Sequence, residues 1–209
     1  MDEPCGEDAD RLGRALAYYS ANAGQFADKV ESLDMSAHYA VLEPLLPPDS
    51  LVLDLGCGSG RDARHFAGAG HRVVGLDPCP EMLAEARRRT PPALAGRIRY
   101  VAGSAPGLPF RRPFCSAIWA YASLLHLPRR AMPQALADCF GALLAGGAIA
   151  LTVKLGGGEE FREGRWFTLW EPGELGDIAA GAGFKVSTAD RIPSVGGASP
   201  WVRVVGRKP

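Results

Sequence analysis

Three glycines at alternating positions follow a short apolar run and form the most informative motif of the chain. The run ends in Asp54-Leu55, and Gly56, Gly58 and Gly60 follow in the order Gly-x-Gly-x-Gly. Glycine is needed where the backbone turns sharply off a strand, and where a ligand approaches the backbone without meeting a Cβ atom. A glycine loop between a strand and a helix is typical of nucleotide-binding proteins.

Two carboxylates accompany this loop. Asp54 stands two residues before the first glycine, and Asp77 ends the next apolar run. In the dinucleotide fingerprint Gly-x-Gly-x-x-Gly the third glycine comes one residue later, and the loop binds a pyrophosphate. A carboxylate there disfavours a pyrophosphate and favours a cationic group. The pair therefore predicts a nucleoside cofactor with a cationic, amino-acid-bearing portion near Asp54 and ribose hydroxyls at Asp77.

The elements that must position these residues alternate along the chain. Short apolar runs alternate with helical patterns, which indicates a parallel sheet covered by helices. The predicted strands are 51–55, 72–76, 98–101, 117–120, 148–153, 184–188 and 202–205. The predicted helices are 61–69, 81–89, 130–144, closed by Gly146-Gly147, and 171–182. The expected fold class is α/β: a Rossmann-like, seven-stranded, mostly parallel sheet with helices on both faces.

Two segments lie outside this rhythm within a single domain, 8–209, that follows a flexible tail, 1–7. Residues 8–46 precede the first strand and are predicted to form two helices, roughly Asp10–Val30 and Met35–Leu46, that serve as an N-terminal helical lid. Residues 156–170 follow the fifth strand and mix glycines, charges and aromatics, which indicates an acceptor-binding flap.

Composition narrows the function classes. The 209 residues suit one domain, and 23 basic and 23 acidic residues give zero net charge, which argues against nucleic-acid binding through bulk charge. The chain has no apolar run of about 18 residues, and its acidic start is unlike a secretory signal. Five widely spaced cysteines, with no Cys-x-x-Cys pair and no metal-ligand spacing of histidines, predict a reduced, cytoplasmic protein without a metal site.

The motifs resemble those of the class I S-adenosylmethionine-dependent methyltransferases, and the resemblance covers roughly residues 15–209. Asp54 to Gly60 resembles the first motif of that family, and Asp77 its ribose-binding acid. Further similar segments are Leu108-Pro109-Phe110, Ala120 to Pro128, and Gly181 to Phe184. A start of the form Tyr-Tyr-x-x-Asn-Ala (Tyr18 to Ala23), a Gly-Arg-Asp and a late Trp201 are similar to a bacterial, small-molecule subgroup.

The resemblance implies S-adenosylmethionine as cofactor, with S-adenosylhomocysteine as product. Ser104 stands where many members carry an adenine-binding aspartate, and its hydroxyl can still accept that bond. The candidate cofactor-binding residues are Asp54, Gly56, Cys57, Gly58, Gly60, Arg61, Asp77, Pro78, Met82, Ser104, Ala105 and Tyr121.

Transfer from a sulfonium depends mostly on placing the nucleophile in line with the methyl–sulfur bond, and a base is needed only when the acceptor must lose a proton. His126, just past the fourth strand, is the candidate base, with Tyr19 as a second catalytic candidate. The alternative for His126 is a packing role. The candidate acceptor-binding residues are Tyr18, Phe26, Lys154, Arg165 and Trp166.

The expected function is methyl transfer to an oxygen, nitrogen or sulfur nucleophile of a small molecule, by a monomer or homodimer that binds neither nucleic acid nor membrane. Two alternatives stay open: a methyltransferase acting on peptide, protein or RNA, and a cofactor-binding protein without transfer activity. The motif Asn/Asp-Pro-Pro-Tyr, which holds a flipped base, does not occur after the fourth strand. The glycine spacing and Asp54 disfavour a nicotinamide-dependent oxidoreductase.

Overall fold

A central seven-stranded sheet organises the molecule, seen in a computed structural model that describes residues 6–110, 113–197 and 199–209. Its strand order is β3-β2-β1-β4-β5-β9-β8, and only β9 runs antiparallel to its neighbours within it. The strands are β1 Leu51–Leu55, β2 Arg72–Asp77, β3 Ile98–Ala102, β4 Cys115–Tyr121, β5 Leu143–Lys154, β8 Lys185–Ile192 and β9 Trp201–Arg207. The predicted fold class is confirmed.

Helices cover both faces of the sheet. They are α1 Gly6–Glu31, α2 Ser36–Leu42, α3 Arg61–Gly68, α4 Pro80–Arg89, α5 Pro92–Ala95, α6 Met132–Ala142 and α7 Pro172–Gly181, with short 3-10 turns at Glu43–Leu45, Leu124–His126 and Arg129–Ala131. Leu42 and Phe66 bury the inner sides of α2 and α3 against Trp119. Leu136 and Leu175 bury α6 and α7 in the other core cluster, which also contains Ile149. Among the described helices, none is long and apolar enough to cross a membrane.

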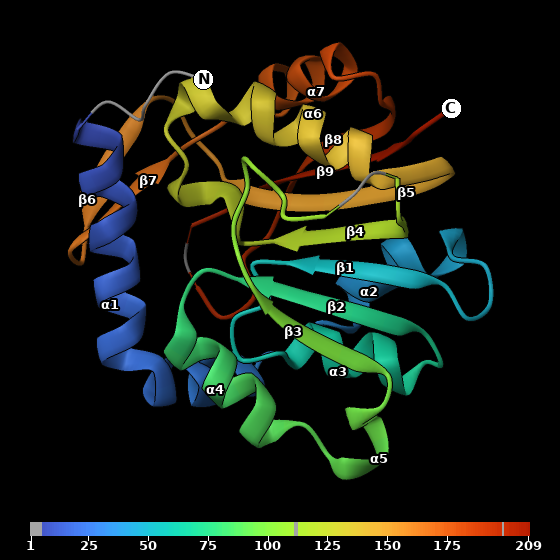
Figure 1. The fold of residues 1–209 in the computed structure, drawn as a ribbon. Coiled ribbons are helices and arrows are strands. Elements are labelled where there is room, and N and C mark those ends of the chain that lie inside the picture. Colours follow the sequence, from blue (N-terminus) through green and yellow to red (C-terminus); the bar gives the residue numbers. More distant parts are fainter. Residues whose placement is uncertain (1–5, 111–112, 198) are drawn as a thin grey trace.

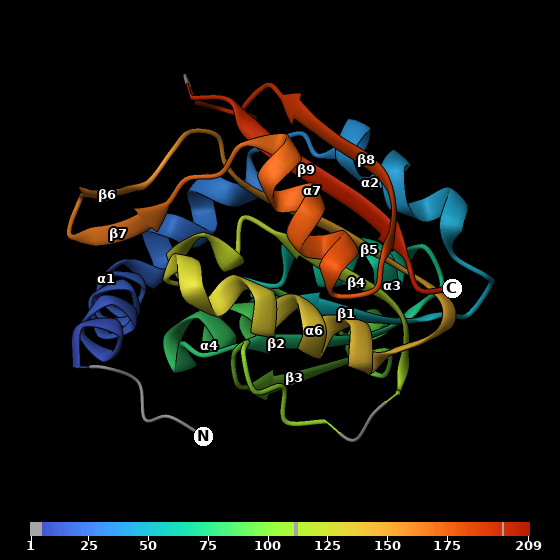
Figure 2. The same ribbon diagram turned by 90° about the horizontal axis from the view of Figure 1, so that it is seen from above.

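Helix α1 stands at the end of the sheet toward which the arrows of the parallel strands point (Figure 1). A separate two-stranded hairpin, β6 Glu159–Arg162 and β7 Arg165–Thr168, lies beside it, and the view from above agrees (Figure 2). Helix α1 and the hairpin therefore lie where the parallel strands end, which is where open α/β sheets bind ligands. The second helix predicted within 8–46 does not join this lid, because Tyr39 and Leu42 of α2 pack on the face of the sheet with Trp119. Of the predicted tail 1–7, residues 1–5 lie outside the described residues, and Gly6 and Glu7 belong to α1.

The largest departure from the predicted elements is at Gly146 and Gly147. The predicted helix 130–144 ends at Ala142, and β5 already begins at Leu143, so the two glycines lie inside a strand and do not close a helix. Leu143 pairs with Cys115, but the next pair joins Ala148 to Ala117, which marks a bulge. A Cβ atom on Gly147 would come within 2.9 Å of two backbone carbonyl oxygens, so glycine here permits a close backbone approach.

Candidate functional site

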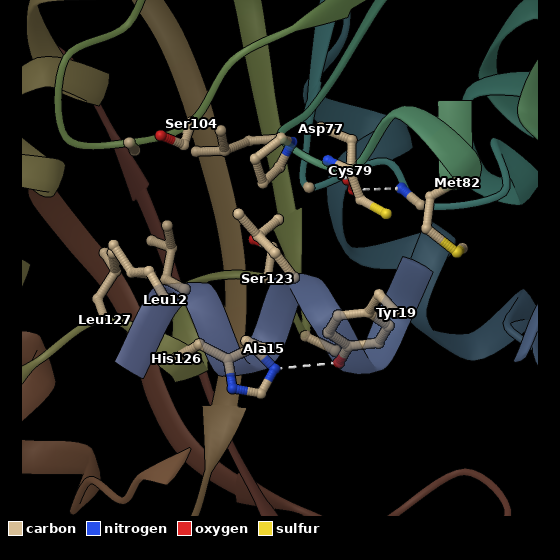
Figure 3. Close-up of a pocket in the computed structure, with 18 of the residues that line it drawn as sticks. Leu12, Ala15, Tyr19, Asp77, Cys79, Met82, Ser104, Ser123, His126 and Leu127 are labelled. Carbon is tan, nitrogen blue, oxygen red and sulfur yellow. Dashed lines mark hydrogen bonds between the residues drawn. The ribbon is translucent and has the colours of Figure 1, made fainter. Parts of the chain in front are cut away.

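The larger of two pockets described here has a volume of about 190 Å³ and opens between the ends of β1, β2 and β4 and the inner side of α1. In Figure 3, Tyr19 of α1 points toward the imidazole of His126, with Asp77 and Ser104 on the opposite side of the view. The pocket is lined by Leu12, Ala15, Leu16, Tyr19, Phe26, Leu55, Gly56, Gly58, Asp77, Pro78, Cys79, Met82, Gly103, Ser104, Ala105, Ala122, Ser123, Leu124, His126 and Leu127.

The glycine loop forms one wall of this pocket. Gly56 has φ +74°, and a Cβ atom added to it would overlap the Cβ atom of Ser123. The amides of Gly56 and Cys57 both donate to the Leu76 carbonyl, which ties the loop to the end of β2. The wall is therefore bare backbone held in place, as the motif predicted.

Asp77 is held by the same loop. Its two carboxylate oxygens accept hydrogen bonds of 2.9 Å from the amides of Gly58 and Cys79. The side chain is mostly buried, and burial raises its pKa, while the two amides act in the opposite direction. The carboxylate is thus fixed in orientation at the pocket wall, with acceptor capacity left for a ligand.

Asp54 lies behind the loop and does not line the pocket. It is 2% exposed, and its Oδ2 atom has no hydrogen-bond partner among the described residues. Burial, together with the nearby Asp62, raises the pKa of Asp54 well above its usual value. A positive charge arriving close to the loop would relieve this cost. The features at the pocket and behind it therefore suit a nucleoside ligand with a cationic group: bare backbone and the fixed Asp77 carboxylate at the wall, and behind the loop the buried Asp54 with one oxygen that lacks a partner.

His126 and Tyr19 meet across the pocket. The Tyr19 hydroxyl lies 3.0 Å from His126 Nε2, and His126 Nδ1 lies 2.7 Å from the Trp166 carbonyl oxygen. Because a carbonyl only accepts, Nδ1 carries the proton and Nε2 accepts from the tyrosine. Burial lowers the pKa of His126 to about 4, and the cationic side chains of Arg165, Lys154 and Arg11 add to this. The imidazole is therefore neutral near pH 7, with both ring nitrogens engaged.

The hairpin joins the same network. The Arg165 guanidinium donates to the Tyr19 hydroxyl at 3.2 Å, pairs with Glu163 and stacks 3.6 Å over the Tyr18 ring. Lys154 is instead held between the rings of Phe167 and Trp201, with its Nζ atom 5.3 and 4.9 Å from their centroids. The side chains of Arg165 and Lys154 therefore contact aromatic rings of the protein itself, and neither lines the first pocket.

The two pockets divide the residues predicted from the sequence. Of the predicted cofactor residues, Gly56, Gly58, Asp77, Pro78, Met82, Ser104 and Ala105 line the first pocket. Arg61 and Tyr121 line only the second pocket, and Asp54, Cys57 and Gly60 line neither. Of the catalytic and acceptor candidates, His126, Tyr19 and Phe26 line the first pocket, whereas Tyr18, Lys154, Arg165 and Trp166 line neither.

Several lining residues were missed. Leu12, Ala15 and Leu16 lie on the apolar stripe of α1, which its periodicity could have indicated. Ser123 follows β4 directly, at the ligand-binding edge. His38 lines the second pocket, and no motif in the sequence indicates it. Among the described residues, no group of three or more His, Cys, Asp or Glu side chains could hold a metal ion.

A strand–glycine loop–helix unit with an acid at the end of the second strand defines an α/β nucleoside-cofactor protein, and comparisons narrow the class. Residues 52–147 match the family described as "Methyltransferase domain". The chain is 32% identical over 197 residues to trans-aconitate 2-methyltransferase of Methylobacterium radiotolerans, covering 79% of this chain and 71% of that protein. The chain belongs to the S-adenosylmethionine-dependent methyltransferases.

Another relative and a solved structure are also similar to this chain. Malonyl-[acyl-carrier protein] O-methyltransferase of Pectobacterium atrosepticum is 32% identical over 144 residues, covering 68% of this chain and 51% of that protein. The crystal structure of Burkholderia thailandensis 1,6-didemethyltoxoflavin-N1-methyltransferase, with that compound and S-adenosylhomocysteine bound, superposes with a TM-score of 0.80 at 23% identity, covering 100% of this chain and 93% of that one. The chain spans between 31% and 52% of the length of this O-methyltransferase and of three further relatives, so it matches only part of them.

Proposed function

We propose that this protein transfers a methyl group from S-adenosylmethionine to an oxygen, nitrogen or sulfur nucleophile of a small molecule. The observation that carries the proposal is the Asp77 carboxylate, fixed by two loop amides beside the backbone of Gly56 and Gly58. When bound, S-adenosylmethionine supplies an activated methyl group on a sulfonium. Ser104 and Ala105 line the same pocket, which supports the proposal that they contact the base of the nucleoside.

The protein's contribution is chiefly to bind, orient and exclude water. Tyr19, Phe26 and the apolar residues of α1 cover the first pocket, and the hydrogen bond from Tyr19 to His126 connects this lid to the end of β4. Exclusion of water and a fixed direction of approach are what an in-line displacement requires. His126 acts as a base only if its bond with Tyr19 opens, because its single lone pair is occupied by that hydroxyl.

Two observations favour a small acceptor. Zero net charge supports an acceptor other than nucleic acid, and relatives named for acting on trans-aconitate and on hydroquinones favour a metabolite. The four described free cysteines, all buried, are compatible with a reducing cytoplasmic compartment. A monomer or homodimer without membrane attachment completes the proposal.

Thermal unfolding with and without ligands tests this function. S-Adenosylhomocysteine and S-adenosylmethionine are expected to raise the melting temperature, whereas NAD is not. Asp77→Ala is expected to weaken S-adenosylhomocysteine binding about 10- to 150-fold, since charge-assisted hydrogen bonds contribute about 1.5–3 kcal/mol. Asp177→Ala, in exposed α7 sequence, is the matched control. No shift of the wild-type protein with either methyl-cycle ligand overturns the proposal.

A further inference from the structure

Lys154 is the last residue of β5 and lies where the chain leaves the sheet for the hairpin, at the same end of the sheet as α1 (Figure 1). It is partly buried, and it pairs with Trp201 across β5 and β9, so both side chains point to the same face. The Lys154 ammonium lies 4.9 Å from the centroid of the Trp201 ring and 5.3 Å from that of Phe167. Two aromatic rings therefore replace part of the hydration of this cation.

Lys154 differs from the neighbouring cations because it has no carboxylate partner. Its ammonium makes no ion pair and no hydrogen bond with the residues that the structure describes. The neighbouring arginines are each paired: Arg11 with Glu159, Arg61 with Asp62, Arg165 with Glu163 and Arg203 with Asp190. A partly buried charge without a counterion is unfavourable, so this position favours an anion from outside the chain.

Three cations face the ring of Phe167, a residue that is 4% exposed. The guanidinium carbons of Arg165 and Arg162 lie 5.1 and 5.4 Å from its centroid, beside the Lys154 ammonium at 5.3 Å. Arg162 pairs with Glu160 only at 3.8 Å, and both of these side chains are exposed, so the pair compensates little of the charge. The cluster therefore carries an excess of positive charge, which attracts anions.

Repulsion within the cluster acts on Lys154 itself. Burial lowers the pKa of Lys154, and the hairpin arginines, Arg162 and Arg165, lower it further. The hairpin acids, Glu160 and Glu163, act in the opposite direction but do not offset this decrease. An anion bound beside the ammonium would raise the pKa again, so the titration of Lys154 reports on anion binding.

Phe167 also connects the cluster to the first pocket. Its ring lies 4.9 Å from the imidazole of His126, which lines that pocket. The positive charge of Lys154 is close enough to contribute to the lowered pKa of His126. Lys154 and a wall residue of the first pocket therefore contact the same aromatic ring.

We propose that the methyl acceptor carries a carboxylate, and that Lys154 binds this carboxylate beside the first pocket, with the apolar part of the acceptor against Phe167. The inference rests on the proposed methyl transfer and adds the charge of the acceptor to it. One ammonium with three N–H donors suits a single carboxylate, whereas a phosphate monoester carries nearly two charges. Arg162, exposed and weakly paired, adds to the attraction.

Lysine NMR tests this site directly, because the sequence contains only four lysines: Lys29, Lys154, Lys185 and Lys208. The full chain, labelled with carbon-13 at the lysine Cε atoms and saturated with S-adenosylhomocysteine, is titrated with 4-fluorobenzoate or with its neutral analogue 4-fluorobenzamide. The benzoate is expected to shift the Lys154 signal and to raise the pKa of Lys154. The benzamide is expected to leave both unchanged.

Two matched variants assign the effect to one side chain. Lys154→Met keeps an unbranched apolar chain without the charge, and it is expected to weaken 4-fluorobenzoate binding at least about tenfold, the value of a charge-assisted hydrogen bond. Lys185→Met, at an exposed position of β8, is expected to bind the benzoate as the wild-type protein does. Neither variant should change the affinity for S-adenosylhomocysteine.

The outcomes separate this inference from the proposed function. If the wild-type protein does not bind S-adenosylhomocysteine, the proposed function fails. If it binds S-adenosylhomocysteine, but the Lys154 signal does not respond to the benzoate or responds equally to the benzamide, only the carboxylate site is refuted. Tighter binding of 4-fluorophenyl phosphate than of the benzoate would also refute it. A loss of S-adenosylhomocysteine affinity in Lys154→Met would assign the lysine to the cofactor and overturn the inference.

Discussion

Tyr19 of α1 and His126 at the end of β4 are joined by a hydrogen bond of 3.0 Å between the tyrosine hydroxyl and Nε2. The bond belongs to a closed circuit. Arg165 of β7 donates to Tyr19, Tyr19 donates to His126, and His126 donates back to the Trp166 carbonyl of β7. Lid, hairpin and sheet edge are thus held by one chain of hydrogen bonds, which polarise one another when buried.

Removing the Tyr19 hydroxyl should open this circuit. Tyr19→Phe leaves Nε2 of a buried imidazole without its donor, and the expected cost is about 1–3 kcal/mol of unfolding free energy. Tyr18→Phe is the matched control, because Tyr18 contacts Arg165 through its ring and its hydroxyl makes no hydrogen bond within the described residues. Urea denaturation of both variants measures the difference. Equal stabilities of the two variants would contradict the circuit.

Acid should destabilise the protein through His126. The pKa of this buried histidine is about 4, below its usual 6.5, so between these pH values the unfolded chain binds the proton and the folded chain does not. The contribution of His126 to the unfolding free energy is therefore fully present above pH 6.5. It falls by about 3 kcal/mol as the pH decreases to 4.

The measurement is the difference in unfolding free energy between the wild-type protein and His126→Asn, followed from pH 7 to pH 4. The difference is expected to shrink as the pH falls, since the variant has no imidazole to protonate. The positively charged groups that face His126 are Arg165, Lys154 and Arg11. A gap that is constant with pH would show that His126 does not titrate abnormally.

A methyl group at Gly56 should damage the cofactor loop. Gly56→Ala places a Cβ atom onto Ser123 and forces a non-glycine residue to φ +74°. The backbone conformation alone costs about 1–2 kcal/mol, and the overlap displaces the loop, so S-adenosylhomocysteine binding should be lost. The control is Gly157→Ala. Gly157 lies just before β6, and a Cβ atom added there has no other atom within 4 Å. Calorimetric titration checks both; normal binding by Gly56→Ala would be evidence against the loop's contact with the cofactor.

Arg11 should anchor α1 to the hairpin. Its guanidinium pairs with Glu159 at 2.6 Å and donates to the Thr168 hydroxyl at 3.2 Å, and it is largely buried. Arg11→Met is expected to lower the unfolding free energy by about 1–3 kcal/mol, because Glu159 loses its main partner. Arg14→Met removes an exposed pair with Asp10 on the same helix and should cost less than about 1 kcal/mol.

Protease susceptibility of α1 supplies the second measurement for Arg11. Limited trypsin digestion of Arg11→Met should cleave within α1 faster than digestion of Arg14→Met, since a detached helix exposes its backbone. The comparison is fair because each variant removes one arginine. Identical cleavage rates would mean that packing of the apolar side chains alone holds the helix.

The amino-acid sequence by itself determined the order of the elements and the cofactor loop. The apolar runs, separated by helical patterns, predicted the bounds of β1, β2, β3 and β4 to within a few residues of those observed. The spacing of the motif alone indicated Gly56, Gly58 and Asp77, which line the first pocket. These features are local, because strand alternation, turn glycines and the acid at a strand end are encoded within a few neighbouring positions.

The tertiary structure decided which distant side chains meet. Spacing carries no information about pairs such as Tyr19 with His126 or Arg11 with Glu159, because packing and not chain proximity brings them together. It also decided that β5 begins at Leu143, where pairing with Cys115 outweighs the helical pattern. Tyr121 is a second example. The sequence correctly placed it at the ligand-binding end of the sheet, but neighbouring side chains at the end of β4 point in alternate directions, so Tyr121 faces the second pocket and not the first.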